Sequence, residues 1–173
     1  MMSTAFRNWG LSMSVRIEQK SYSSLLSIME KSRCGVCVKR FDRTGERLFR
    51  RVAFNVAIGN RDDHLRNHGF ILTSDGWRLA PAFDVNPNIE KAAHVLNLDE
   101  TDNRPSLETV IDTSEWYPLS KDRGAKIVYE IAQETRQWRQ RAAGANIARA
   151  DIELTAAAFA LSEADFVELK LSK

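Results

Sequence analysis

One amphipathic helix followed at once by a dense polar loop constrains this 173-residue chain more than any other feature. Between Glu46 and Ile58 the apolar residues recur at positions i, i+1, i+4, i+5, i+8 and i+9, a broad stripe that is typical of a buried helix. Gly59 and Asn60, which tolerate the left-handed conformation of a helix C-cap, come next and end the helix. The sequence therefore predicts a core helix that leads directly into residues 60–68.

The loop of residues 59–68 gathers two carboxylates, two imidazoles, two guanidiniums and two amides within ten residues. A short extended run, residues 69–73, follows the loop, and a second run, residues 77–80, comes after a strong Ser-Asp-Gly turn signal. Because a hairpin places its two ends side by side, we expect Asn67 to lie close to Asp84. Carboxylate and amide oxygens are hard ligands that suit Mg²⁺, so the sequence predicts a magnesium site at this point.

The order of these polar residues is typical of phosphoryl-transfer sites. In such sites one Asp orients the substrate hydroxyl and accepts its proton, an Asn five residues later binds Mg²⁺, and a second Asp beyond a hairpin binds Mg²⁺ at the phosphates. Here Asn67 follows Asp62 by five residues and Asp84 follows it by 22, with the predicted hairpin between them. Asp62 is therefore expected at the mouth of the site.

The rest of the chain predicts an α+β fold that is mostly helical, with the small hairpin set among the helices. The length suits one ordinary domain with its own core. Residues 92–98 are expected to form a short extended stretch. Helices are predicted over residues 21–33, 46–58, 106–112, 120–143, 151–161 and 162–171, the last beginning at a capping box formed by Ser162 and Asp165.

Simpler interpretations compete with the catalytic one in the loop itself. Adjacent carboxylates such as Asp62 and Asp63 are usually solvated turn formers, and Asp63 is expected to point away from the site as a bystander. His64 and His68 have the spacing of zinc ligands on a helix, but Gly69 and the strand after it leave no helix to carry them. A zinc site is therefore disfavoured.

Other candidate residues have structural explanations as well. Trp77 and Phe83 resemble a base-stacking pair, but apolar packing beside the hairpin explains them better. His94 lies in a mixed stretch and is expected to be structural. Cys34 and Cys37 form a lone C-x-x-C, which without a second ligand pair is weak support for zinc or redox chemistry.

Charge and hydropathy exclude several classes of protein. The net charge of +2, from 25 basic and 23 acidic residues, argues against a dedicated nucleic-acid binder. No run of about 18 apolar residues predicts a transmembrane helix, and the first ten residues do not form a secretory signal. We therefore expect a cytoplasmic protein that contacts neither a membrane nor nucleic acid directly.

Two runs of the sequence resemble a known family. The runs are FNVAIGNRDDHLRNHGF, residues 54–70, and GWRLAPAFDVNP, residues 76–87. Both are similar to the C-terminal lobe of HipA-family serine/threonine kinases, the toxins of HipA–HipB-type toxin–antitoxin systems. The D-x-H-x-x-N core, which begins at Asp62, is also similar to that of phosphatidylinositol kinases.

The resemblance covers most of the chain unevenly. It is most specific over residues 47–87, extends through residues 94–98 and the C-terminal helices, and fails over about the first fifteen residues. We therefore expect an unmatched N-terminal segment, residues 1–20, followed by a HipA-like kinase lobe, residues 21–173.

The resemblance also implies a role for each polar residue of the site, with ATP and Mg²⁺ as the cofactors. Asp62 is the catalytic Asp, and Asn67 and Asp84 hold Mg²⁺. Arg66 stands where family members commonly have Lys, so the positive charge is kept but a compact ammonium is exchanged for a wide guanidinium. The residues expected to contact the nucleotide are His64, Arg66, Asn67, Phe83 and Asp84.

One part of such a kinase is not recognised in the sequence. The N-terminal lobe of a HipA-type kinase covers ATP and supplies a phosphate-binding loop and a nucleotide-contacting Lys. Only 61 residues precede Asp62, and none of the eight glycines is spaced as G-x-G-x-x-G or G-x-x-x-x-G-K. We therefore expect a truncated kinase lobe that is weak alone or depends on a partner that supplies the other lobe.

The resemblance leaves two functions open. The first is a serine/threonine kinase lobe that transfers the γ-phosphate of ATP to a protein hydroxyl, with a component of translation as the candidate substrate. The alternative is a catalytically inactive remnant or interaction module that binds a kinase partner or an antitoxin. A HipB-like antitoxin and a separate N-terminal kinase lobe are the expected partners.

Overall fold

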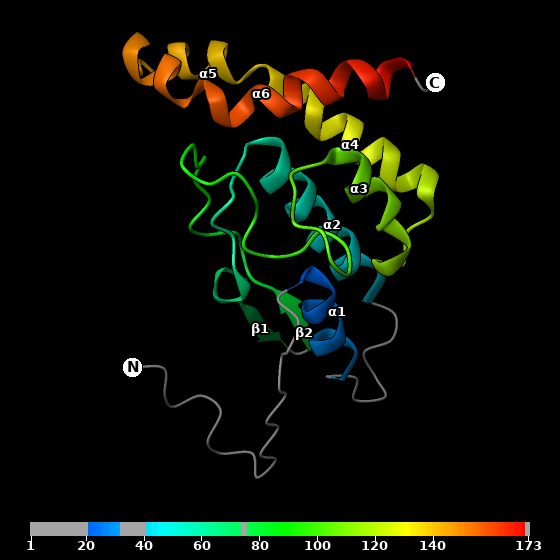
Figure 1. The fold of residues 1–173 in the computed structure, drawn as a ribbon. Coiled ribbons are helices and arrows are strands. Elements are labelled where there is room, and N and C mark those ends of the chain that lie inside the picture. Colours follow the sequence, from blue (N-terminus) through cyan, green and yellow to red (C-terminus); the bar gives the residue numbers. More distant parts are fainter. Residues whose placement is uncertain (1–20, 32–40, 74–75, 172–173) are drawn as a thin grey trace.

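Helix α2 (Phe41–Ala57) lies at the centre of the structure, a computed structural model that describes residues 21–31, 41–73 and 76–171 (Figure 1). The apolar stripe predicted from the sequence is its buried face, where Leu48, Phe49 and Val52 are almost fully enclosed. The helix begins at Phe41, earlier than the stripe alone predicted. The segment that contains Cys34 and Cys37 lies outside the described residues.

The other elements surround α2 (Figure 1). The two-stranded hairpin lies near one end of the molecule, and helices α5 and α6 lie side by side across the other. In chain order the elements are α1 (Tyr22–Lys31), α2, the 3-10 turn η2 (Leu65–Asn67), β1 (Phe70–Thr73), β2 (Gly76–Leu79), α3 (Leu107–Asp112), the 3-10 turn η3 (Ser114–Trp116), α4 (Lys121–Arg136), α5 (Trp138–Gly144) and α6 (Arg149–Leu171).

The structure confirms the predicted α+β class with helices in the majority. Strands β1 and β2 form the expected antiparallel hairpin, in which Phe70 pairs with Leu79 and Thr73 pairs with Gly76. None of the described helices is long and apolar enough to span a lipid bilayer.

The main core is built from α2 and the elements that pack on it. Tyr22 and Leu25 of α1, Val110 of α3, and Ile127 and Val128 of α4 are at most 2% exposed. Burying an aliphatic side chain of this size stabilises a fold by roughly 1.5–3 kcal/mol. The apolar faces of four helices therefore meet on a single centre, which holds α2 in place behind the polar loop.

A second, smaller cluster joins the end of α2 to the C-terminal helices. It contains Ile58, Ala158 and Phe159, and the ring of Trp138 stacks on that of Phe159 with 4.2 Å between centroids and 9° between planes. The backbone of Gly59 lies directly against α6. This cluster fixes the point at which the chain leaves α2.

The helices at the C-terminus differ from the prediction. The helix expected over residues 120–143 is divided at Gln137 into α4 and α5, a break that leaves Trp138 stacked on α6. The two helices expected over residues 151–161 and 162–171 are one continuous helix, α6. The cap signal at Ser162 was misleading because no Gly or Pro follows to interrupt the helix there.

Residues 92–98 do not form the short extended stretch that the sequence predicts. They run as an irregular loop in which His94, Leu96 and Leu98 are buried, and their bridge to another segment of extended backbone is a single isolated one, from Asn97 to Ser21. Half-buried and buried residues nevertheless alternate along residues 93–98. No neighbouring strand is present in the described part of the chain to pair with this segment.

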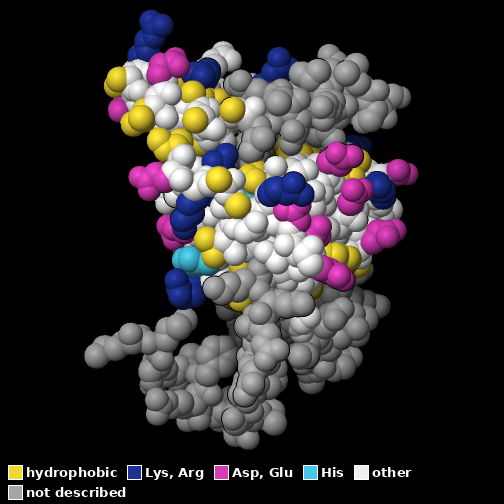
Figure 2. Space-filling model, viewed as in Figure 1, with side chains coloured by type: hydrophobic (Ala, Val, Ile, Leu, Met, Phe, Trp, Pro, Cys, Tyr) yellow, Lys and Arg dark blue, Asp and Glu magenta, His cyan; other side chains and the backbone are white. Residues whose placement is uncertain are grey.

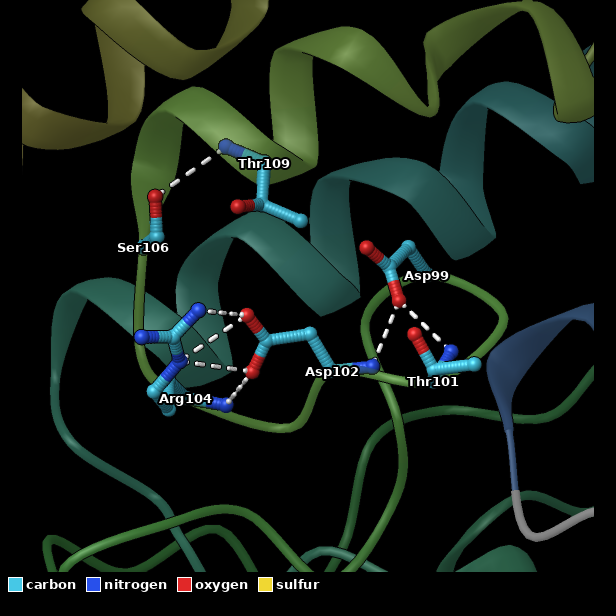
Figure 3. A network of polar contacts seen from close by, with 6 residues as sticks. All are labelled: Asp99, Thr101, Asp102, Arg104, Ser106 and Thr109. Atoms are coloured by element: carbon cyan, nitrogen blue, oxygen red, sulfur yellow. Dashed lines mark hydrogen bonds and ion pairs between the residues drawn. The ribbon is translucent and has the colours of Figure 1, made fainter.

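Hydrogen bonds from backbone N–H groups to nearby side chains hold the segment that leads into α3 (Figure 3). One carboxylate oxygen of Asp99 accepts hydrogen bonds from the backbone N–H groups of Thr101 and Asp102, at 2.7 and 2.6 Å. Arg104 pairs with the Asp102 carboxylate and lowers its pKa to about 2. Ser106 caps α3 by accepting from the backbone N–H of Thr109 at 3.1 Å.

Replacing Gly59 with alanine should destabilise this fold. Gly59 has a φ of +66°, and a Cβ there would lie 2.4 Å from the carbonyl oxygen of Ala158. The left-handed backbone alone costs a non-glycine residue about 1–2 kcal/mol, and α6 would also have to move. Urea denaturation should therefore give a lower free energy of unfolding. Gly144→Ala is the matched control, because nothing lies within 4 Å of its Cβ position, and an equal loss in both variants would contradict the account.

Candidate functional site

The polar loop leaves α2 in a direction that its first two residues fix. The carbonyl of Gly59 accepts hydrogen bonds from the backbone N–H groups of Arg61 and Asn88, both at 2.9 Å. The backbone N–H of Asn60 donates to the carbonyl of Asn55 at 2.8 Å. The loop is therefore held by α2 on one side and by the segment after the hairpin on the other.

Asp63 is the buried anchor of the loop. Its carboxylate accepts hydrogen bonds from the Tyr22 hydroxyl at 2.7 Å, from the Asn55 side-chain amide at 2.7 Å and from Nε2 of His68 at 2.9 Å. These four residues, the Asp63 network, join α1, α2 and the residue after η2. Burial alone would raise the pKa of Asp63, but the three hydrogen bonds outweigh burial and hold it below its usual value.

The side chain of Asp63 points away from the site, as expected of a bystander to the chemistry, but it points into the protein, where only 2% of the residue is exposed. Asp63 is therefore a structural anchor and not a solvated turn former. No spacing rule could have revealed this role, because Tyr22 lies 41 residues earlier in the chain. Two adjacent carboxylates thus have opposite surroundings, with Asp63 buried and Asp62 exposed.

Asp62 faces solvent and is paired with a lysine from a distant loop. Its side chain is 56% exposed, and the Lys91 ammonium donates a hydrogen bond to one of its carboxylate oxygens. This hydrogen bond is the main reason that the pKa of Asp62 lies below its usual value, and the nearby His64 and Arg66 act in the same direction. The contact of Lys91 was not predicted, because no pattern in the sequence distinguishes it among residues 88–98.

The loop residues that are predicted to contact the nucleotide differ in their surroundings. Asn67, at the end of η2, is 5% exposed, and its backbone N–H donates to the carbonyl of His64 at 2.8 Å. Nδ1 of His64 is buried, and it has no hydrogen-bond partner among the described residues. Arg66 is exposed.

The hairpin returns the chain to the loop as the sequence predicted. The backbone N–H of Ala80 donates to the carbonyl of Gly69 at 2.8 Å, and a Cβ on Gly69 would lie 3.8 Å from a ring carbon of Phe83. The segment before Asp84 therefore lies against a residue only two positions after Asn67. That Asn67 and Asp84 bind one metal ion stays a prediction.

Asp84 has an unusual backbone conformation for its position. Its φ is +55°, a left-handed value that Asp tolerates better than most residues, and its side chain is exposed. One of its carboxylate oxygens accepts a hydrogen bond from the Asn86 amide at 3.2 Å. The second oxygen has no recorded partner among the described residues, which suits a metal ligand.

The donor set at this site fits Mg²⁺ better than a transition metal. An amide oxygen from Asn67 and a carboxylate from Asp84 are hard ligands, and Mg²⁺ usually completes its shell with water and phosphate oxygens. No group of three or more His, Cys, Asp or Glu side chains is arranged to hold a metal in the part of the chain that the structure describes. The site could therefore hold Mg²⁺ together with a phosphorylated ligand.

A match to a protein family covers most of the chain, site included. The model of the HipA-like C-terminal domain matches residues 9–139. The chain belongs to this family. The matched range contains the whole polar loop and the hairpin, and it ends within α5. The matched range begins at residue 9, within the first fifteen residues, where the resemblance fails.

A solved HipA has the same fold as this HipA-like chain. HipA of Shewanella oneidensis MR-1, solved with HipB and its operator DNA, superposes with a TM-score of 0.60 and 19% sequence identity. The match covers 86% of this chain and 35% of that HipA, so this chain spans about a third of its length. At this identity the likeness establishes the fold alone. No curated protein matches the sequence.

His94 is buried beside the loop, and its titration can be tested. The backbone of Asn60 lies next to its ring, and its own backbone N–H donates to the carbonyl of Asn103 at 2.9 Å. Burial lowers the pKa of His94 to about 4, and the nearby Arg61 guanidinium adds to the effect. The ring is therefore neutral in the folded protein at neutral pH, as expected of a structural histidine.

The pH dependence of stability follows from this low pKa. A histidine in the unfolded chain has a pKa of about 6.5, so it binds a proton before the buried one does as the pH falls. Stability should be complete above pH 6.5 and should decrease toward pH 4, by about 3 kcal/mol in all. Urea denaturation at several pH values measures this slope. His94→Asn should flatten it, and an unchanged slope in that variant would rule out this assignment.

Replacing Asp63 with alanine should be strongly destabilising. The variant leaves the Tyr22, Asn55 and His68 donors buried without their acceptor, and breaking a buried charged network typically costs about 3–5 kcal/mol. The free energy of unfolding from urea denaturation measures the loss. Asp62→Asn, at the adjacent exposed position, should change stability by less than about 0.5 kcal/mol. Similar losses in the two variants would contradict the division between a buried and an exposed carboxylate.

Proposed function

We propose that this chain is the catalytic lobe of a HipA-like serine/threonine kinase, which transfers the γ-phosphate of ATP to a protein hydroxyl. The observation that carries the proposal is the arrangement around Asp62. This carboxylate is exposed within the polar loop, the next residue, Asp63, is buried, and the hairpin returns the segment of Asp84 to the same loop. Membership of the HipA-like family supports the assignment.

Each residue of the site has a role in this reaction. Asp62 orients the substrate hydroxyl and accepts its proton as the bond to phosphorus forms. Asp62 is ionised at neutral pH, as an aspartate with an ordinary pKa would be, and it can accept that hydrogen bond. When bound, Mg²⁺ would neutralise the phosphate oxygens, and Asn67 and Asp84 are the residues that would hold it. The nucleotide contacts are assigned to His64, Arg66, Asn67, Phe83 and Asp84.

The proposed partners follow from the family and from the length of the match. The related HipA was solved with HipB and operator DNA, which supports a HipB-like antitoxin as a partner of this chain. A separate N-terminal kinase lobe is the second proposed partner, and a translation component is the proposed substrate. On the face drawn in Figure 2 acidic and basic side chains are interspersed, which supports the expectation of no direct contact with nucleic acid.

An inactive interaction module is the alternative function. The sequence has no glycine-rich phosphate-binding loop, and the hairpin carries two exposed apolar side chains, Ile71 and Leu72, that a partner could cover. In that case the chain would bind a kinase partner or an antitoxin without performing chemistry.

Nucleotide binding by the chain alone should be weak. Without a covering lobe, ATP loses hydrogen bonds from backbone amides and a lysine, and each charge-assisted bond contributes about 1.5–3 kcal/mol. Losing two of them lowers the affinity by about 100-fold or more, so we expect a dissociation constant in the high-micromolar range or weaker. Isothermal titration with Mg·ATP measures it. A sub-micromolar complex would reveal a phosphate site that this assignment lacks.

Phosphoryl transfer, alone or with the other lobe, should depend on Asp62. Asp62→Asn keeps the size of the side chain but cannot accept the hydroxyl proton, so the transfer of labelled γ-phosphate should fall by about 10²–10⁴-fold. Asp84→Ala should instead raise the Mg²⁺ concentration needed for half-maximal activity. Lys121→Ala, which removes an exposed ion pair with Asp112 between the start of α4 and the end of α3, is the control and should leave the rate unchanged. Full activity of the Asp62→Asn preparation would mean that a contaminating kinase is the source of the activity. It would favour the inactive-module alternative.

A further inference from the structure

Lys91 reaches the proposed catalytic carboxylate from a different part of the chain. It lies 29 residues after Asp62 and seven after Asp84, in the loop that follows the hairpin. Its ammonium donates to a carboxylate oxygen of Asp62, and within the described residues no other cation forms an ion pair with Asp62. Nothing in the sequence or in the roles assigned above accounts for this contact.

The backbone at Lys91 is held on the same loop that carries Asp62. The side-chain oxygen of Asn88 accepts hydrogen bonds from the backbone N–H groups of Glu90 and Lys91, at 3.0 and 2.9 Å. The guanidinium of Arg61 donates to the carbonyl of Lys91, and the backbone N–H of Asn88 donates to the carbonyl of Gly59. The backbone that carries the Lys91 side chain is therefore held against the loop of Asp62.

Stability does not explain this ion pair. The side chains of Lys91 and Asp62 are 42% and 56% exposed, and exposed ion pairs contribute little to folding. A lysine ammonium has three N–H donors, and only one of them is used by Asp62. The other two make no hydrogen bond to the described residues, so they can donate to oxygens of a bound ligand.

We propose that Lys91 is a second catalytic residue, which binds the γ-phosphate of ATP and stabilises the charge that develops on it during transfer. This inference rests on the proposed kinase function. The hydroxyl held by Asp62 must approach the γ-phosphorus, so a cation bonded to Asp62 lies next to the group that moves. Positioning and charge stabilisation are the main means of catalysis in phosphoryl transfer.

The transfer step does not change the protonation of Lys91. The hydroxyl oxygen of the substrate forms a bond to the γ-phosphorus, while the bond from that phosphorus to the β,γ-bridging oxygen breaks and ADP leaves. The hydroxyl proton passes to Asp62. Lys91 stays protonated throughout, and its N–H groups donate to the γ-phosphate oxygens before, during and after transfer.

A comparison of two nucleotides tests the contact apart from catalysis. Isothermal titration of the full chain with Mg·ATPγS and with Mg·ADP should show that Lys91→Met weakens the first complex at least tenfold more than the second. Lys91→Arg, which keeps the charge, should stay within a few-fold of the wild type. Lys121→Met removes a more exposed lysine that also forms an ion pair with an aspartate, and it should affect neither complex.

The second readout is the rate of γ-phosphate transfer. It is measured with the other lobe present if the chain alone is inactive. We expect Lys91→Met to lower the rate by about 100-fold with an unchanged unfolding midpoint. A faster Lys91→Met variant would mean that Lys91 blocks Asp62, and equal weakening of both nucleotides would mean that it does not contact the γ-phosphate. Either result overturns the proposal while leaving the kinase function intact. The wild-type chain could instead bind neither nucleotide and transfer no phosphate, alone or with the other lobe present. That result would overturn both this proposal and the kinase function.

Discussion

The buried carboxylate of Asp63 is the feature on which the geometry of the site depends. A carboxylate removed from water is costly unless hydrogen bonds replace its hydration, and here donors from Tyr22, Asn55 and His68 supply them. Because those donors come from α1, α2 and the end of η2, the network joins three segments at one point. With Asp63 fixed inward, the neighbouring Asp62 is left at the surface.

A second set of contacts ties the loop to the segment after the hairpin. The carbonyl of Gly59 accepts from Asn88, and the carbonyl of Arg61 accepts from Val95 at 3.1 Å. Helix α6 supports the same loop from behind through its close approach to Gly59. The site is thus formed by two loops that hydrogen bonds hold together, while Asp62 and Phe83 remain exposed to solvent and accessible to the proposed nucleotide.

Local patterns in the sequence predicted the parts of this structure that local interactions determine. The stripe from Leu48 to Ala57 predicted α2, and the Ser-Asp-Gly turn predicted the hairpin, because helical periodicity and turn chemistry are properties of neighbouring residues. The contacts of Asp63 and Lys91 were missed because their partners lie 41 and 29 residues away. The break at Gln137 was missed for the same reason, since it accompanies packing of Trp138 on Phe159.

The central claim is that Asn67 and Asp84 form one metal site next to Asp62. A crystal structure of the chain with Mn²⁺ and a non-hydrolysable ATP analogue tests it most directly, because Mn²⁺ takes the same oxygen ligands as Mg²⁺ and is located by its anomalous scattering. The account predicts one ion bound by the Asn67 amide oxygen and an Asp84 carboxylate oxygen, at about 2.0–2.2 Å, with the γ-phosphate facing Asp62. An ion and nucleotide bound elsewhere, or Asp84 turned to the opposite face from Asn67, would contradict it.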